Sequence, residues 1–363
     1  MNPKGFKDLI KEVHDLGICQ QCGGCVSFCS SADYDIIEFK DLNSPPKFIN
    51  EEKCLECGIC YCICPQTHIL DDDLNKIHNF SEFYSMPIGF FRDIYSCQAM
   101  DRDFLKYGTD GGVVNSIIDY LIKKKIIDGA IVANSKSPFS REAILAKNKE
   151  DLIEASGIKL DISSQLDKIK EFNTYTQSIP KLNHYKFKKL AVVGTPCQIY
   201  TIRCMQNLGV VPSQNIEICL GLFCYENFFF DKLKIKNFEK EFHIKFEKIE
   251  KINIKEDLRL KLNNNGQKIL HIPFHRLNTY MRAACYSCYD FTNIYADISF
   301  GGLASSDKFT TVLTRTKKGA DLISKALETG VIKCIDLEAS KKNEMKDLLI
   351  KYSRLKIKRY QDF

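Results

Sequence analysis

The sequence predicts a small α+β head over residues 1–80, followed by a larger α/β domain with a mixed sheet over residues 81–363. Nine of the 17 cysteines of this 363-residue chain lie between Cys19 and Cys64, which indicates a compact head organised around its cysteines. From about residue 90 onward, apolar runs of strand length alternate with helix-like segments. A chain of this length has room for one large domain beyond such a head.

The head begins with an expected helix over residues 5–16, where apolar side chains recur at helical spacing, and Gly17 stops this helix before the first cysteine. After Cys64, the three consecutive aspartates that begin at Asp71 and the stretch up to Pro87 are interpreted as a linker. This interpretation places the domain boundary near residue 80.

Eight of the nine head cysteines form two runs with the spacing C-x2-C-x2-C-x3-C, which is that of a bacterial-type, ferredoxin-like fold with two [4Fe-4S] clusters. The fourth cysteine of each run binds the cluster of the other run, so the ligand sets cross. Cys62 fits neither set, and the first run lacks the proline that follows the second. The predicted sets are Cys19, Cys22, Cys25 and Cys64 for one cluster, and Cys54, Cys57, Cys60 and Cys29 for the other.

Zinc and disulfide bonds are the alternatives for these cysteines. Zinc sites combine two CxxC pairs and have no use for a third cysteine two residues further on. No secretion signal precedes the first run, and dense CxxC usage is typical of a reducing compartment. We therefore expect iron-sulfur clusters in a cytoplasmic protein, free or peripheral to a membrane complex. No apolar run reaches the ~18 residues of a transmembrane segment.

Charge is distributed unevenly between the two parts. Residues 1–80 contain seven lysines and 13 acidic residues, which gives a net charge of −6. Because the whole chain has a net charge of +6, the remaining residues carry +12. A basic domain suits anionic cofactors, and an acidic redox head suits docking to a protein partner or larger electron-transfer complex. The alternative is a solvated surface without selective meaning. We expect no nucleic-acid partner.

The larger domain reads as alternating strands and helices. A turn at Thr109–Gly112 precedes an amphipathic helix over Val113–Lys124. The expected strands are Phe90–Ala99, Asp128–Ala133, Lys189–Gly194 and Ile216–Phe223.

The sequence Asn263-Asn264-Asn265-Gly266 within Arg259–Pro273 predicts a β-hairpin and therefore a mixed sheet. The stretch Lys232–Lys255 is expected to form an exposed helix and strand. Its predicted inward side chains are Leu233, Phe238 and Phe242.

Four further cysteines, Cys197, Cys224, Cys285 and Cys288, stand near the ends of expected elements. Two of them follow apolar strands, where an α/β sheet presents ligands. Their spacing leaves open whether they bind a cluster or are buried structural cysteines.

Several short motifs lie between residues 90 and 320. They are Gly111-Gly112-Val113-Val114, Val193-Gly194-Thr195-Pro196-Cys197-Gln198, Gly221-Leu222-Phe223-Cys224, Cys285-Tyr286-Ser287-Cys288, Ala296-Asp297-Ile298-Ser299-Phe300-Gly301-Gly302, and Val312-Leu313-Thr314-Arg315-Thr316 with Gly319. In combination they resemble the β subunit of the coenzyme F420-reducing hydrogenase and of F420-dependent dehydrogenases, a flavoprotein family. The resemblance implies one FAD, a site for coenzyme F420 as substrate against the FAD ring, and a third [4Fe-4S] cluster at Cys197, Cys224, Cys285 and Cys288.

The same resemblance implies a set of cofactor-binding residues. A glycine pair at a helix start lets the backbone approach a phosphorylated ligand, although a plain helix-start turn is the alternative. A buried aspartate that caps a turn is likewise the alternative for Asp297. The expected set is Thr109, Gly111, Gly112, Val113, Lys159, Gly194, Thr195, Pro196, Asp297 and Gly301.

These parts predict an F420-dependent oxidoreductase from a methanogenic archaeon. A deazaflavin gives up a hydride whereas a cluster takes one electron, so FAD is needed between them and no catalytic side chain is expected. Electrons would pass from F420H2 through FAD and the three clusters to a partner, or in reverse, because cluster potentials span a wide range. The alternatives are a ferredoxin-dependent reductase of another organic substrate and a non-catalytic electron-transfer subunit.

Overall fold

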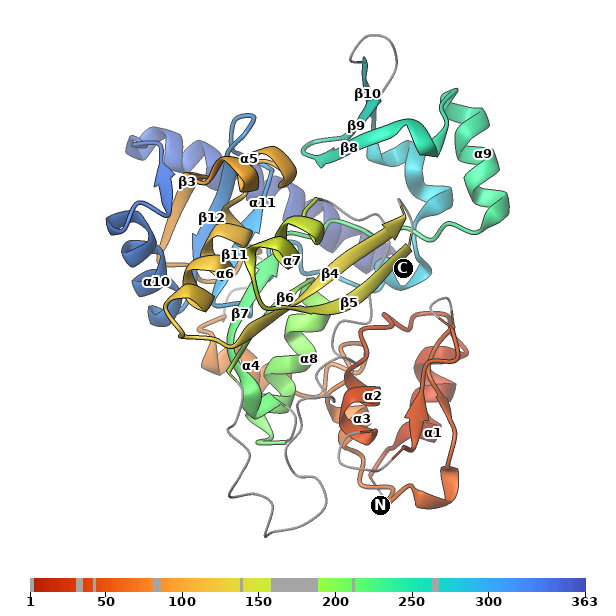
Figure 1. The fold of residues 1–363 in the computed structure, drawn as a ribbon. Coiled ribbons are helices and arrows are strands. Elements are labelled where there is room, and N and C mark those ends of the chain that lie inside the picture. Colours follow the sequence, from red (N-terminus) through yellow and green to blue (C-terminus); the bar gives the residue numbers. More distant parts are fainter. Residues whose placement is uncertain are drawn as a thin grey trace.

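A computed structural model shows the head beside one end of a larger body, with a small second sheet projecting from the body (Figure 1). The structure describes residues 3–30, 35–41, 44–80, 86–137, 140–157, 189–210, 213–262 and 268–363. Within them, no helix combines the length and the apolar character that crossing a membrane requires.

The head is built from short elements around one apolar core. Its helix starts as predicted, although the second half is a π-helix over Ile10–His14. Phe6, Leu9 and Val26 are almost fully buried in the core, which explains why such short elements hold together. The elements are α1 (Phe6–Leu9), α2 (Gly24–Cys29), β1 (Ile37–Glu38), β2 (Lys47–Phe48), a 3-10 turn over Glu51–Lys53, and α3 (Ile59–Cys62), with β1 and β2 antiparallel.

The interpretation of the aspartate run as a linker is wrong. Residues Asp71–Ile77 form helix α4, and the three aspartates occupy its first turn, where negative charge interacts favourably with the helix dipole. Leu70 and Leu74 are buried in a core that they share with Ile199 of the body. Leu70 and Leu74 are four residues apart, which is helical spacing, and this signal outweighs the run of charge.

The body is an α/β domain around an eight-stranded mixed sheet, as predicted. The strand order is β13-β3-β12-β11-β7-β6-β4-β5, in which β4, β6, β7 and β11 are parallel and the others pair antiparallel. All four predicted strands are present. The strands are β3 (Asp93–Ala99), β4 (Gly129–Ser137), β5 (Ser140–Ala146), β6 (Leu190–Gly194), β7 (Ile216–Leu222), β11 (Ile298–Gly301), β12 (Thr310–Thr314) and β13 (Ile332–Cys334).

Helices cover both faces of this sheet. Successive strand residues point to opposite faces, so Val193 packs with α6 and α10 whereas Val192 packs with α8 and α4. The predicted helix after the Thr109–Gly112 turn is α6. The body helices are α5 (Arg102–Tyr107), α6 (Val113–Lys123), α7 (Lys149–Glu154), α8 (Pro196–Asn207), α10 (Lys317–Glu328) and α11 (Ala339–Asp362).

The predicted hairpin is present but does not belong to the main sheet. Strands β9 (Leu258–Leu262) and β10 (Lys268–Ile272) form a separate antiparallel sheet with β8 (Ile249–Ile254). Their apolar side chains pack on helix α9 (Lys232–Phe242) through the buried Phe238 and Phe242. The prediction that Leu233 points inward is wrong, because this side chain is 66% exposed.

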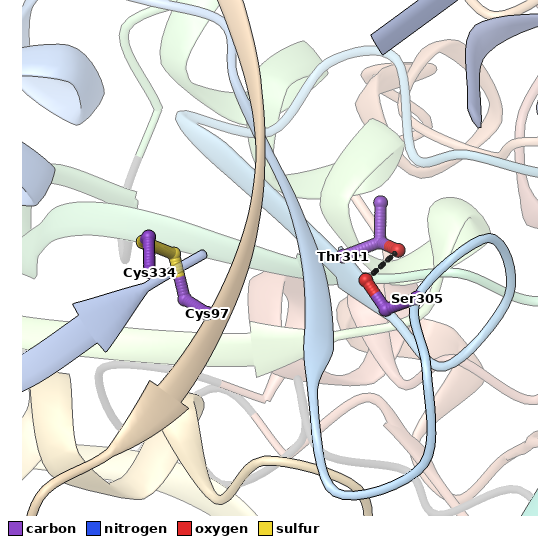
Figure 2. Close-up of a disulfide and its surroundings, with 4 residues drawn as sticks. All are labelled: Cys97, Ser305, Thr311 and Cys334. Carbon is purple, nitrogen blue, oxygen red and sulfur yellow. Dashed lines mark hydrogen bonds between the residues drawn. A yellow bond between two sulfur atoms is a disulfide. The ribbon is translucent and has the colours of Figure 1, made fainter. Parts of the chain in front are cut away.

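A disulfide joins Cys97 of β3 to Cys334 of β13, which stand at directly paired positions with their Cα atoms 4.0 Å apart (Figure 2). The two cysteines are 237 residues apart in sequence, so no spacing pattern pointed to the pair. The bond fastens the edge strand β13 next to the strand that leads to the Gly111-Gly112 turn.

Candidate redox site

A cavity of about 270 Å³ opens at the carboxyl ends of the parallel strands β6, β7 and β11. This edge is where open α/β sheets bind ligands. Phe223, Phe291 and Phe300 contribute apolar walls. Five members of the expected cofactor set also line it, namely Thr109, Gly112, Val113, Thr195 and Gly301.

The glycine pair has two different tasks. Gly112 is the N-cap of α6 with φ +66°, and a Cβ there would overlap the Phe104 carbonyl. Gly111 lies behind the cavity, because its N–H donates to Thr310 Oγ1 at 3.0 Å and a Cβ would meet the Cys97 carbonyl at 2.5 Å. The two glycines thus let this turn pack closely against β3 and β12, and the first turn of α6, which follows it, faces the cavity.

Thr195 begins helix α8 and stands between the cavity and the first of the four body cysteines. Its N–H donates to Gln198 Oε1 at 2.9 Å, and its hydroxyl lies 3.2 Å from the Cys197 Sγ atom. Gly194 and Pro196 do not line the cavity. Pro196 instead lines a second, smaller hollow between head and body, together with Cys197.

Asp297 also lies outside the cavity. Its carboxylate is 3.0 Å from Arg203 and accepts hydrogen bonds from the Cys219 N–H and the Thr316 hydroxyl. Burial acts to raise the pKa of Asp297, but Arg203 and these donors outweigh it and hold the pKa below its ordinary value. These contacts match the structural alternative for this residue. Lys159 lies outside the described residues.

The cavity holds charged side chains that the sequence analysis did not single out. The Lys255 ammonium lies 3.5 Å from the buried Asp110 carboxylate and donates to the Gly302 carbonyl at 2.8 Å. Burial raises the pKa of Asp110 despite this cation. The sequence predicts an exposed strand at Lys255. The side chain lies inside the cavity only because the small sheet packs against it.

Of the four body cysteines, Cys224 lines the cavity, whereas Cys197 and Cys288 line the smaller hollow between head and body. Cys224 follows β7, and Cys197 is in the first turn of α8. Cys224 interacts electrostatically with Cys285 and Cys288, and Cys197 with Cys288 and Cys224. The Asn227 N–H donates to Cys285 Sγ at 3.3 Å. Burial raises the pKa of the Cys224 thiol to about 12, so an ionised thiolate there requires a nearby cation.

The two cysteine runs of the head repeat one backbone conformation. The residue before the second cysteine has positive φ in both runs, +52° at Gln21 and +49° at Glu56. The residue after it is a glycine with positive φ, +90° at Gly23 and +76° at Gly58. Each run then enters a short helix, α2 or α3. The matched conformation indicates that the two runs are shaped to bind the same kind of group.

The last cysteine of each run lies near the other run. The thiol of Cys64 interacts with Cys22 and Cys19, whereas that of Cys29 is hydrogen-bonded to Cys60. This hydrogen bond and burial raise the pKa of Cys29. Proximity across the runs is the arrangement that crossed ligand sets require.

The head docks on the body next to the four body cysteines. Cys22 is the strongest charge neighbour of Cys197, and its Sγ atom lies 3.6 Å from the Thr201 hydroxyl of α8. Gln20 donates to the Ala284 carbonyl at 2.5 Å, and Arg282 bonds to Gln21. The junction therefore combines these polar contacts with the apolar core that Leu70 and Leu74 share with Ile199, and it lies close to cysteines of both parts.

The donor chemistry of these sites fits iron-sulfur clusters better than single ions. Within the part of the chain that the structure describes, no three His, Cys, Asp or Glu side chains are placed to hold one metal ion. A [4Fe-4S] cluster binds its four thiolates through four different irons, so its ligands stand farther apart. Buried thiols with N–H and hydroxyl donors at their sulfurs suit such a cluster.

Comparison with known proteins identifies the family of the chain. Residues 94–170 match the N-terminal part of the β subunit of coenzyme F420 hydrogenase/dehydrogenase, and residues 187–340 match its C-terminal part. The chain belongs to this family. Both matched segments lie in the body, which confirms the resemblance seen in the motifs.

Individual relatives place the match in context. An uncharacterized protein of Methanocaldococcus jannaschii is 29% identical over 93% of this chain and 96% of its own length. The coenzyme F420-dependent sulfite reductase of the same organism is 30% identical over 86% of this chain, a segment that covers 46% of that enzyme. One of the subunits of the F420H2 dehydrogenase of Methanosarcina mazei is 24% identical over 85% of this chain and 82% of its own length.

The fold of the body also has a solved counterpart. A chain of the F420-reducing [NiFe] hydrogenase complex from Methanosarcina barkeri is similar, with a TM-score of 0.66, 27% identity and coverage of 76% of this chain and 91% of that chain. The mixed α/β architecture around the cavity is therefore shared with that hydrogenase chain.

Proposed function

We propose that this protein oxidises F420H2, or reduces F420, by hydride transfer to or from FAD, with one-electron transfer through three [4Fe-4S] clusters to a protein partner. One observation carries the proposal. Cys224 lines the cavity and lies near Cys285 and Cys288, and Cys197 lies near both Cys224 and Cys22 of the first cysteine run of the head. Several family relatives carry F420 in their names, which supports the same substrate for this chain.

The cavity supplies the residues that would hold the FAD. The first turn of α6, from Val113 to Asn115, lines it and offers backbone N–H groups to a phosphate. The apolar walls exclude water from a planar ring. When bound, FAD would exchange a hydride with the deazaflavin and single electrons with a cluster.

The cysteines are assigned to three ligand sets. The set nearest the cavity is Cys197, Cys224, Cys285 and Cys288. The head sets are Cys19, Cys22, Cys25 and Cys64, next to the body, and Cys54, Cys57, Cys60 and Cys29, farther away.

The partner is proposed to dock at the far side of the head. Cys57 is exposed, and the nearby Leu55, which precedes Glu56, is 79% exposed. A partner that approaches this end reaches the outermost ligand set.

Anaerobic purification and cofactor analysis test the proposal. We expect about 12 irons and one FAD per chain, since each cluster contributes four irons. The protein should bleach or restore the deazaflavin absorbance when it is supplied with an artificial electron acceptor or donor. A protein with all cofactors but no F420 turnover would be a reductase of another substrate, and a protein without flavin would be a non-catalytic carrier.

A further inference from the structure

Lys356 is a buried lysine in the last turns of helix α11, with only 1% of its surface exposed. Its ammonium donates to two main-chain carbonyls, those of Cys224 at 2.5 Å and of Asp290 at 2.7 Å. A buried ammonium is strongly unfavourable unless an anion or a dense set of acceptors compensates it. Two neutral carbonyls compensate it only in part.

The carboxylates near Lys356 are already engaged. Glu226 forms an ion pair with Arg359 at 2.7 Å. The Asp290 carboxylate accepts the backbone N–H groups of Asn293 and Ile294 at 2.8 and 2.9 Å. The ammonium also lies close to the thiols of Cys288, Cys224 and Cys285, and it contacts the main chain of Cys224 itself. The cation therefore faces three of the four body cysteines.

Helix α11 holds this cation firmly in place. The ring of Tyr360 packs on Tyr289, with 5.5 Å between centroids, and Phe363 stacks on Tyr286 at 5.9 Å. Arg359 donates to the Tyr225 carbonyl at 2.7 Å and to the Cys285 carbonyl at 3.3 Å. One helix thus anchors both cysteine-bearing loops. It lies almost wholly beyond residue 340, where the family match ends.

We propose that Lys356 is a positioning residue whose buried positive charge raises the reduction potential of the cluster bound by Cys197, Cys224, Cys285 and Cys288. This inference rests on the proposed function, because it assumes that these cysteines hold a [4Fe-4S] cluster. Such a cluster with four thiolates is an anion, and accepting one electron increases its negative charge by one. A fixed cation nearby therefore stabilises the reduced form more than the oxidised form.

The proposal explains both sides of the contact. The cluster adds an anion beside the buried ammonium, and the ammonium makes this cluster a better acceptor for electrons that leave the cavity. Charge and burial around metal centres are recognised means of setting their potentials. A purely structural lysine would serve only to hold α11 against the two carbonyls.

The test is a redox titration of the whole anaerobic protein, followed by electron paramagnetic resonance, in three variants. Lys356→Met removes the charge and keeps the length of the side chain, and Lys356→Arg keeps the charge. Lys358→Met is the matched control, since Lys358 is an exposed lysine two residues away on the same helix. We expect the midpoint potential of the body cluster to become more negative in Lys356→Met, to stay near wild type in Lys356→Arg, and to be unchanged in Lys358→Met.

Each other outcome has a defined meaning. A Lys356→Met protein that keeps about 12 irons with an unchanged or more positive midpoint overturns the proposal. If Lys356→Met loses about four irons and Lys356→Arg keeps them, the charge is needed already for cluster assembly, which supports the proposal. If both variants lose them, the position serves shape and not charge, and the proposal is wrong. Wild-type protein with only about eight irons would instead refute the third cluster of the proposed function.

Discussion

The head and the body bring their cysteines together in different ways. In the head, each run of four cysteines spans 11 residues and repeats the same turn and helix. In the body, the four cysteines are spread from Cys197 to Cys288, and they meet because β6 and β7 are neighbours in the sheet and helix α11 anchors the loops of Cys224 and Cys285. A local motif therefore specifies the head sites, whereas the body site depends on the folded sheet. Single substitutions should expose this difference.

Replacement of one body cysteine should have the largest effect. Cys224→Ala is expected to remove the body cluster, about four irons, and to slow electron passage from the cavity to the head by a factor of about 100 or more. FAD should remain bound, because the rest of the cavity is intact. Iron analysis and stopped-flow reduction of the head clusters measure both effects.

Cys204→Ala is the matched control, since Cys204 is a buried cysteine of α8 outside the proposed sets. It should cost about 1 kcal/mol of stability and no iron. Equal iron loss in both variants would contradict the body ligand set.

Replacement of Cys29 should have the next largest effect, and it tests whether the ligand sets of the head cross. Cys29→Ala is expected to damage the cluster of Cys54, Cys57 and Cys60 and to spare the cluster of the first run, because the Cys29 thiol lies at Cys60. Electron paramagnetic resonance distinguishes the two clusters. Cys62→Ala, the cysteine outside both sets, should leave both signals in place. Selective loss of the first-run signal in Cys29→Ala would show that the sets do not cross.

Weakening the junction between head and body should have a smaller effect. Arg282→Met removes the contact to Gln21, and a hydrogen bond from a charged group contributes about 1.5 to 3 kcal/mol. We expect all irons to be retained, with slower electron transfer between body and head and faster proteolysis between them. The exposed Arg354→Met is the control. Loss of first-run iron in Arg282→Met would mean that the arginine supports the cluster itself.

The smallest effect is expected from acid titration of the body. The folded pKa of Asp297 lies below its ordinary value of 3.8, so its contribution to stability is present above that pH and is lost as the pH falls through the lower folded pKa. Below about pH 4, the free energy of unfolding should therefore fall less steeply with decreasing pH in Asp297→Asn than in the wild type. Urea unfolding between pH 3 and 6 measures this. Equal slopes for both proteins would mean that Arg203 does not hold the carboxylate ionised.

Sequence patterns predicted four of the eight strands of the main sheet, helix α6 and the burial of Phe238 and Phe242, because apolar periodicity reflects which face an element buries. They failed where packing overrides composition. The aspartate run begins helix α4, and the hairpin joined a second sheet since its apolar face packs on α9. Of the expected cofactor set, Gly111 forms a backbone hydrogen bond and Asp297 an ion pair, and neither lines the cavity. Asp110 and Lys255 do line it, although no local sequence pattern indicated this.

The sequence alone determined the family, the mixed α/β body and the two cysteine runs of the head, because these depend on spacing within short segments. Only the tertiary structure decided that Cys22 stands beside Cys197, that Cys224 opens onto the cavity and that Lys356 faces the body cysteines. Two of these contacts join residues more than 100 positions apart. Their proximity follows from strand order and helix docking, which no local spacing encodes.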